Sequence, residues 1–193
     1  MRRLGWAILL LVLLGIGGII SFTSFGTAPP RSPVAARPVP PADGAAGALV
    51  VPVAGVGREQ LTDSWGDARG GGTRAHHGID IMAPRGTPVR AAAAGTVEKL
   101  FTSRLGGIAT YVRTVDGGTI HYYAHLDGYA PSLHEGQRVA AGETIGFVGD
   151  TGDAGPGNTH LHFGVQRMRA GERWWQGQDV NPYPLLAGSR PSR

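Results

Sequence analysis

His76-His77-Gly78-Ile79-Asp80 and His160-Leu161-His162 hold four of the seven histidines of this 193-residue chain, together with one carboxylate. If both stretches are strands, side chains at even offsets point to one face, so the polar ends of each stretch can converge on a single point. Gly78 has no side chain to obstruct a close approach there. Because a catalytic zinc ion takes three ligands from His, Asp or Glu and leaves a fourth position open, the two stretches provide the material for a metal site.

Two absences narrow the chemistry of this site. The chain contains no cysteine, which excludes a sulfur-rich structural zinc site. It also contains no His-Glu-x-x-His sequence, so the glutamate base of helical zinc proteases is missing. Histidine is the natural substitute for that base, because its unperturbed pKa of about 6.5 allows it to accept and donate protons near neutrality.

A third motif, Tyr123-Ala124-His125-Leu126, lies between the two histidine stretches, and Gly-rich segments follow it at 136–139 and 142–146. With these motifs, the chain from about residue 49 to 186 resembles the lysostaphin-type, or LytM-like, zinc endopeptidases that cut peptide cross-links in bacterial cell walls. The family signatures His-x-Gly-x-Asp, Tyr-x-His-Leu and His-Leu-His-Phe all occur here, in order and at plausible separations.

The resemblance implies a role for five side chains. It makes His76, Asp80 and His162 the ligands of one Zn2+ per chain, and it makes His125 and His160 the catalytic histidines beside the metal. We therefore expect hydrolysis of a peptide bond by zinc-activated water, with histidine as general acid and base.

Other residues near the motifs have no fixed role in this chemistry. His77 fills the variable position after the first ligand and is expected to point away from the metal. The segment 64–74 is too Gly-rich for regular structure and is expected to form a mobile loop at the cleft edge. There Trp65 and Arg74 either contact substrate or serve as a packed Trp and a solvated Arg. The loop 155–159 differs from the Ser-Thr-Gly-Pro run of many members, which leaves the substrate preference open.

The predicted fold is all-β: a compact domain of antiparallel sheets with Gly-rich loops around the zinc cleft. Asp116-Gly117-Gly118 is a strong hairpin signal, the 32 glycines suit tight turns, and no amphipathic helix of convincing length is found. The expected strands lie at 49–53, 88–90, 95–97, 111–115, 119–125, 142–148 and 160–165.

Alternation along the strand expected at 119–125 places His121, Tyr123 and His125 on one face. His121 is therefore expected either in or beside the cleft or, equally, as a surface residue of the strand.

The N-terminal segment predicts a link to a membrane. Residues 4–20 are uncharged and mostly apolar, and they follow Arg2 and Arg3. A run of this length approaches the ~20 residues that cross a bilayer. No clean Ala-x-Ala cleavage site follows, which favours an uncleaved transmembrane anchor at 1–26 over a signal peptide.

The remaining chain is expected to divide into a Pro/Ala-rich linker at 27–48, a zinc metallopeptidase domain at 49–188 and a tail at 189–193. The expected location is the cell envelope. An anchored protein would sit in the inner membrane with its catalytic domain in the periplasm or extracytoplasmic space, whereas a cleaved one would be secreted.

The distribution of charge argues against nucleic acid as a partner. The whole chain has a formal charge of +4, but residues 49–188 contain 12 basic and 13 acidic side chains, a net charge of −1. The excess positive charge therefore lies outside the domain that carries the motifs, and that domain is not expected to bind polyanions.

The motifs favour one of three classes of function. The preferred one is an endopeptidase acting on peptidoglycan stem peptides or their cross-links, with peptidoglycan peptides as partners and direct stem-peptide cross-links as the favoured target. The alternative is a non-catalytic family member that regulates other cell-wall hydrolases, or an intact site held closed by a regulatory protein partner. A lipoyl- or biotinyl-type carrier fails, because Lys99 is the only lysine and stands in the wrong context.

Overall fold

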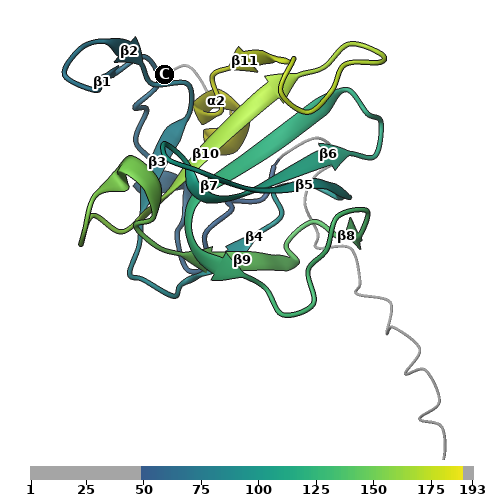
Figure 1. The fold of residues 1–193 in the computed structure, drawn as a ribbon, viewed down its shortest axis with the longest axis horizontal. Coiled ribbons are helices and arrows are strands. Elements are labelled where there is room, and N and C mark those ends of the chain that lie inside the picture. Colours follow the sequence, from purple (N-terminus) through teal and green to yellow (C-terminus); the bar gives the residue numbers. More distant parts are fainter. Residues whose placement is uncertain (1–48, 189–193) are drawn as a thin grey trace, which may run out of the picture. The chain divides into compact units, whose positions relative to one another are not determined.

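The computed structural model describes residues 49–188, and these form mostly antiparallel β structure (Figure 1). Among them the one α-helix has five residues. The elements are η2 (Arg58–Gln60), β1 (Ala68–Arg69), β2 (Arg74–Ala75), β3 (Ile79–Met82), β4 (Pro88–Arg90), β5 (Gly95–Ser103), β6 (Gly107–Thr114), β7 (Thr119–Tyr129), β8 (Arg138–Val139), β9 (Thr144–Val148), η3 (Gly152–Ala154), β10 (His160–Arg167), β11 (Gln178–Val180) and α2 (Tyr183–Ala187). The predicted antiparallel β fold is confirmed.

The strands form one large sheet and one small hairpin. The nine-stranded sheet runs β11-β10-β7-β6-β5-β8, with β3 added to β10 and with β9 linking β7 to β4. The hairpin predicted at Asp116-Gly117-Gly118 joins β6 to β7, and Gly117 adopts a φ of +73° in its turn. Strands from the middle and the end of the chain thus lie next to one another in the centre of the sheet.

Alternation along β3 and β10 separates the core from the polar side chains. Ile79 and Ile81 of β3 are buried, as are Leu161 and Phe163 of β10. In the register of the two strands, Asp80 is directly opposite His162. Burial of the four apolar side chains therefore directs the polar side chains between them to the other face of the sheet.

Strand β7 breaks the alternation that the sequence led us to expect. Between the pairs that join it to β6, β7 has one residue more than its neighbour, and His125 in this bulge has a φ of +61°. The bulge turns His125 to the face opposite that of Tyr123, which is fully buried in the core. The prediction that His121, Tyr123 and His125 share one face is therefore wrong for His125, whereas His121 and Tyr123 both face the core.

Two other local predictions are wrong. Residues 49–53 form an isolated bridge from Val53 to Val89 instead of a strand, because Pro52 has no N–H to continue a ladder. The segment 64–74 is partly regular, since β1 pairs with β2. Gly70, Gly71 and Gly72 make the turn between these strands possible, since each has a positive φ.

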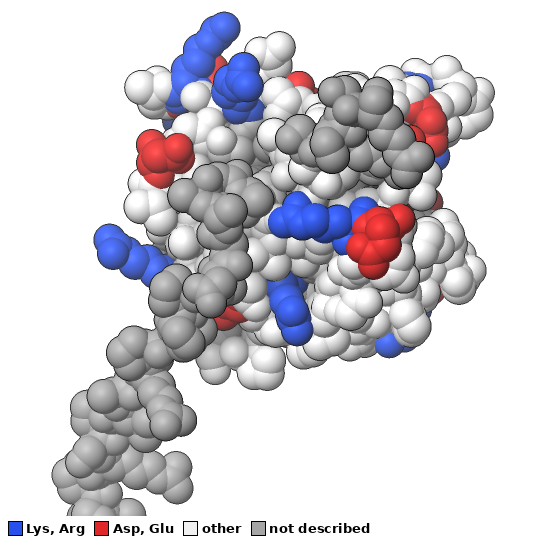
Figure 2. All heavy atoms as spheres, turned by 180° about the vertical axis from the view of Figure 1, so that it is seen from behind, with Lys and Arg blue, Asp and Glu red and all other residues white. Residues whose placement is uncertain are grey.

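Charged side chains do not gather into one patch on the surface that Figure 2 shows. Outside the grey atoms, basic side chains on this face are separated by uncharged surface or lie beside acidic ones. This face offers no continuous basic surface to a polyanion.

Among residues 49–188, no helix is long and apolar enough to span a membrane. The expected anchor at 1–26, the linker at 27–48 and the tail at 189–193 lie outside the described residues. The division of the chain at these boundaries stays a prediction.

His121 predicts a pH dependence of stability. Its side chain is 1% exposed, contacts Phe163, and has an Nδ1 without a hydrogen-bond partner. Burial lowers the pKa of His121 from 6.5 to about 4, although Asp116 opposes this. Because the unfolded chain binds the proton more readily, stability should fall as the pH falls from 6.5 towards 4.

We expect this one group to remove about 2.5 kcal/mol from the free energy of unfolding at pH 4.5 relative to pH 8. The measurement is urea unfolding of the metal-free protein at both pH values. His121→Leu should reduce the pH dependence by that amount, whereas His134→Leu, at an exposed position, should not. An unchanged pH dependence in His121→Leu would contradict the buried neutral histidine.

Candidate active site

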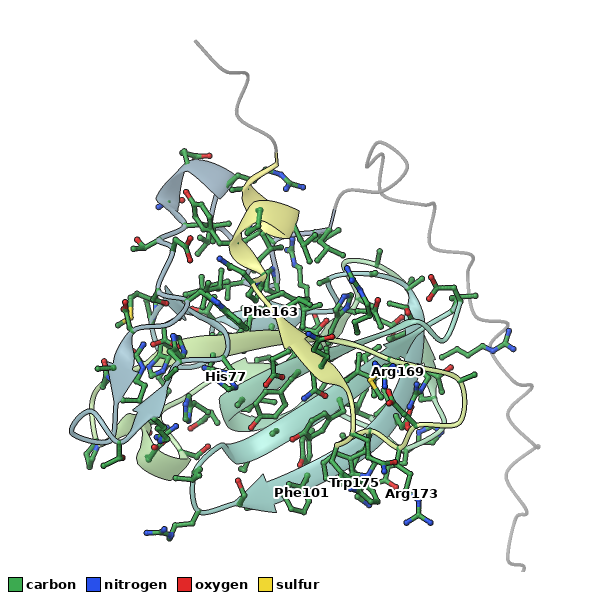
Figure 3. The ribbon with its side chains drawn as sticks, turned by 90° about the horizontal axis from the view of Figure 1, so that it is seen from above. His77, Phe101, Phe163, Arg169, Arg173 and Trp175 are labelled. Carbon is green, nitrogen blue, oxygen red and sulfur yellow. The ribbon has the colours of Figure 1, made fainter. Side chains whose placement is uncertain are left out.

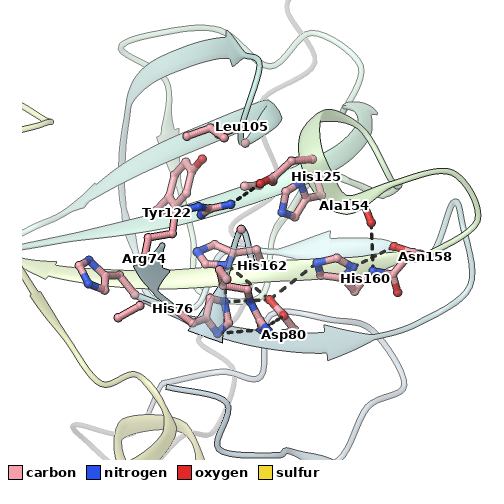
Figure 4. Close-up of a pocket in the computed structure, with 17 residues that line it drawn as sticks. Arg74, His76, Asp80, Leu105, Tyr122, His125, Ala154, Asn158, His160 and His162 are labelled. Atoms are coloured by element: carbon pink, nitrogen blue, oxygen red, sulfur yellow. Dashed lines mark hydrogen bonds and ion pairs between the residues drawn. The ribbon is translucent and has the colours of Figure 1, made fainter. Parts of the chain in front are cut away.

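A cleft of about 700 Å³ lies over one face of the sheet, and all five predicted site residues line it (Figure 4). The hairpin β1–β2 forms one wall and supplies Arg69 and Arg74. The segment that leads from η3 to β10 forms another wall and supplies Asp153 and Asn158. Arg74 and Asp153 form an ion pair that joins the two walls across the cleft.

Three of the residues at the floor of the cleft form a compact cluster. His76 Nε2 lies 2.8 Å from His162 Nδ1 and 3.1 Å from Asp80 Oδ1. Asp80 Oδ1 lies 3.3 Å from His162 Nδ1. Ligand atoms about 2.0 to 2.1 Å from a tetrahedral ion are about 3.3 Å apart, so the three atoms have nearly the spacing of metal ligands. In the part of the chain that the structure describes, these three side chains are the group that could hold a metal ion.

Two further observations show that the cluster fits a cation. Asp80 Oδ1 is buried and has no hydrogen-bond partner, which a bound cation would supply. A Cβ on Gly78 would lie 2.7 Å from His162 Nε2 and 2.7 Å from the carbonyl oxygen of Phe163, so only glycine leaves room for this ring. The sequence therefore provides both the ligand atoms and the space they need.

Neighbouring groups orient the cluster. His76 Nδ1 donates to the carbonyl oxygen of Ser64 at 2.7 Å, which leaves the lone pair of Nε2 directed at the cluster. The Ser64 hydroxyl accepts the backbone N–H of Asp80 at 3.1 Å. Arg69 Nη2 donates to Asp80 Oδ2 at 2.5 Å and thereby leaves Oδ1 as the oxygen that faces the two histidines.

The electrostatics favour an ionised Asp80 carboxylate beside a neutral His162 ring. Burial alone would raise the pKa of Asp80, but its contacts with His162 and His76 outweigh burial and hold the pKa well below its usual range. Burial lowers the pKa of His162, although Asp80 opposes this. An ionised carboxylate and unprotonated ring nitrogens are the states that a metal ion requires.

The two predicted catalytic histidines stand beside this cluster on different strands. His160 Nδ1 donates to the carbonyl oxygen of Asn158 at 2.9 Å, and its Nε2 lies 3.7 Å from Asp80 Oδ1. His125 faces His160 with 4.8 Å between ring centroids. Burial lowers the pKa of His125 to about 4, although the hydrogen bond to Thr151 opposes this, so the ring is neutral at pH 7.

Thr151 fixes the position of His125. Its carbonyl oxygen accepts the His125 Nδ1 hydrogen at 2.7 Å. Its hydroxyl donates to the carbonyl oxygen of Leu126 at 2.8 Å and accepts the N–H of Ile108 at 3.0 Å. The threonine thus ties the bulge of β7 to β6, and the lone pair of His125 Nε2 is left free.

The other residues singled out from the sequence have different surroundings. His77 is not part of the cluster of His76, Asp80 and His162. Its ring contacts Asp179 at 2.8 Å and stacks on Trp65 with 5.7 Å between ring centroids. Trp65 does not line the cleft, whereas Arg74 does. His121 faces the core, so both expectations for it, cleft and surface, are wrong.

Sequence reasoning missed three residues of the site. Arg69 lies in the Gly-rich segment. Thr151 lies in a turn far from either histidine stretch. Neither spacing nor composition distinguishes these two residues from their neighbours in the sequence. Tyr122 lines the cleft, although the alternation expected along 119–125 placed it on the face opposite that of His121, Tyr123 and His125. Burial raises its pKa to about 12, so its phenol keeps its proton and can donate a hydrogen bond in the cleft.

Comparisons with known proteins show which family this chain resembles. The sequence profile of "Peptidase family M23" matches residues 74–182. The chain is 40% identical over 129 residues to the L-Ala–D-Glu endopeptidase of Bacillus subtilis. The aligned region covers 64% of this chain and 38% of the relative. The chain is also 44% identical over 112 residues to the DD-carboxypeptidase/endopeptidase Mpg of Neisseria meningitidis. This aligned region covers 56% of this chain and 22% of the relative.

Solved structures show the same fold. The catalytic domain of the antimicrobial peptidase lysostaphin from Staphylococcus simulans aligns with a TM-score of 0.55 and 29% identity, covering 67% of this chain and 94% of that domain. The chain spans well under half the length of the curated relatives named above.

The contact between Arg69 and Asp80 predicts an effect on metal affinity. Arg69→Met should weaken metal binding about tenfold, because Asp80 loses the donor that orients its carboxylate. Arg74→Met is the matched control, since this arginine belongs to the same hairpin but pairs with Asp153. Competition with a chelating dye measures both affinities, and equal losses in the two variants would contradict a specific role for Arg69.

Thr151 predicts an effect on turnover without loss of metal. Thr151→Val removes both hydroxyl hydrogen bonds, so His125 should shift and kcat should fall on the order of tenfold. Thr151→Ser keeps the hydroxyl and should restore kcat. Metal content, measured on the same samples, should be unchanged in both, and a parallel loss of metal in Thr151→Val would argue against a role confined to His125.

Proposed function

This chain belongs to peptidase family M23, and we propose that it is a zinc-dependent endopeptidase that hydrolyses peptide bonds in peptidoglycan stem peptides or their cross-links. Membership of this metallopeptidase family implies a metal, and the cluster of His76, Asp80 and His162 is where we propose that one Zn2+ binds. The observation that carries the proposal is the buried Asp80 Oδ1, which has no hydrogen-bond partner between two histidine nitrogens.

The cluster suits zinc because of its donor set. Two imidazole nitrogens and one carboxylate are ligands that zinc takes in catalytic sites, and three ligands leave a position open for water or substrate. A bound zinc ion would lower the pKa of water to about 7 and polarise the scissile carbonyl.

In this mechanism the two remaining histidines move the protons. His125 and His160 each donate Nδ1–H to a backbone carbonyl, so the neutral form of each ring has its lone pair on Nε2. One Nε2 accepts a proton from the attacking water, and the protonated ring then delivers a proton to the departing amine nitrogen. The fixed carbonyl partners hold both rings in the tautomer that this transfer requires.

The substrate class rests on the relatives. Their names describe endopeptidases of different bonds, an L-Ala–D-Glu bond in one and a DD-bond in the other. We propose that the substrate here is a peptidoglycan peptide, with the direct stem-peptide cross-link as the favoured target. A regulatory role without catalysis is not favoured, because the five side chains that hydrolysis needs all line one cleft.

The proposed location is the cell envelope, with an inner-membrane anchor at residues 1–26 and the catalytic domain outside the cytoplasm. This placement is supported by the apolar run at 4–20 that follows Arg2 and Arg3. Peptidoglycan lies in that compartment, so the anchor and the proposed substrate agree.

Substitutions in His160-Leu161-His162 separate the two proposed roles. The purified chain should contain about one zinc per chain by elemental analysis and should release peptide fragments from cell-wall sacculi. His162→Ala should lose both metal and activity because it removes a ligand. His160→Ala should lose activity, by at least about a hundredfold, and keep most of the metal. Loss of metal in His160→Ala with retention in His162→Ala would reverse the assignment.

A further inference from the structure

A row of aromatic side chains leads out of the cleft along the sheet. Tyr122, which lines the cleft, has its ring 5.7 Å from the ring of His162. Tyr122 stacks on Tyr111 with 4.6 Å between ring centroids, and Tyr111 contacts Trp174 at 4.6 Å. The row therefore begins beside His162 and continues onto the outer surface.

The outer end of this row is exposed. Trp174 contacts Phe101 at 5.3 Å and Trp175 at 5.1 Å between ring centroids. Phe101 is 39% exposed and Trp175 is 52% exposed. Figure 3 shows Phe101, Trp175 and Arg173 together at one edge of the molecule. We call Tyr122, Tyr111, Trp174, Trp175 and Phe101 the aromatic ridge.

The loop between β10 and β11 presents the two tryptophans in an ordered conformation. Arg113 of β6 donates to the carbonyl oxygen of Glu172 at 2.9 Å and also binds the carboxylate of Glu98. The backbone N–H of Arg173 donates to Gln176 Oε1 at 2.8 Å, which closes the turn that holds both rings. Little conformational entropy would be lost when a ligand stacks on rings held in this way.

Packing explains only part of the ridge. Trp174 is half-buried between Tyr111 and Phe101, so this ring packs against the sheet. Trp175 and Phe101 remain exposed beside it, and exposed aromatic surface that continues into a binding cleft is typical of a ligand subsite.

We propose that the aromatic ridge is a subsite for the glycan strand of peptidoglycan. N-acetylated pyranose rings would stack on Trp175 and its neighbours while the stem peptide enters the cleft at Tyr122. A pyranose ring presents a flat face of C–H groups that packs on an aromatic face. Its hydroxyl and amide oxygens can accept hydrogen bonds from Arg173, whose guanidinium carbon lies over the Trp175 ring, 5.3 Å from the ring centroid. This inference rests on the proposed function, because the glycan is the polymer to which stem peptides are attached.

The test compares two substrates that contain the same peptide cross-link. One is a cross-linked muropeptide that retains its sugars, and the other is the same peptide after the sugars have been removed. Trp175→Ala should raise KM about tenfold for the first substrate, with kcat unchanged, and should leave both constants unchanged for the second. Trp175→Phe should restore KM because it keeps an aromatic face.

A binding measurement tests the ridge without catalysis. Titration of the full chain with the β-1,4-linked tetramer of N-acetylglucosamine should give a saturable change in tryptophan fluorescence, and Trp175→Ala should abolish it. Val115→Ser is the matched control, because Val115 is 83% exposed in the hairpin between β6 and β7 and should behave as the unmodified chain.

Several results would overturn the proposal. An equal rise in KM for both substrates would show that Trp175 contacts the peptide or stabilises the fold. An unchanged KM for the sugar-bearing substrate would show that the aromatic ridge does not bind the glycan. Self-association of the chain that Trp175→Ala abolishes would make the ridge a protein interface. Failure of the unmodified chain to cleave either substrate would contradict the proposed function instead, and the tetramer titration would still decide on the ridge.

Discussion

The antiparallel pairing of β3 with β10 places Asp80 directly opposite His162, and the remainder of the site is built around this pair. The register is fixed by burial, because Ile79, Ile81, Leu161 and Phe163 fill the core on the other face. A shift by one residue would carry the carboxylate and the imidazole into that core. The hydrophobic pattern that folds the two strands therefore also assembles the ligands.

The cluster of Asp80, His76 and His162 lacks a positive charge between its three ligand atoms. A carboxylate oxygen and two ring nitrogens within about 3 Å of one another, partly removed from water, are favourable only with a positive charge between them. Arg69 neutralises the outer oxygen of Asp80 and leaves the inner one without a partner. Within residues 49–188, the polar atom Asp80 Oδ1 is thus left unsatisfied at a place where a cation would satisfy it.

Sequence reasoning succeeded where spacing alone determines position. The residues of His160-Leu161-His162 alternate along a regular strand, so their faces follow from the period of two. The alternation expected along β7 failed, because a bulge with a left-handed residue at His125 reverses it, and no residue type in the sequence indicates this bulge. His125 therefore lines the cleft while His121 and Tyr123 face the core. Arg69 and Thr151 act through hydrogen bonds that only the tertiary structure forms, and a linear pattern does not encode them.

We propose that His76, Asp80 and His162 hold the metal while His125 and His160 do not bind it. The most direct measurement is anomalous scattering at the zinc absorption edge from crystals of the zinc-loaded protein. We expect one peak, bonded to His76 Nε2, Asp80 Oδ1 and His162 Nδ1, with both other rings uncoordinated. A peak bonded to His160 or His125, or no peak in the cleft, would rule out this assignment of the ligands.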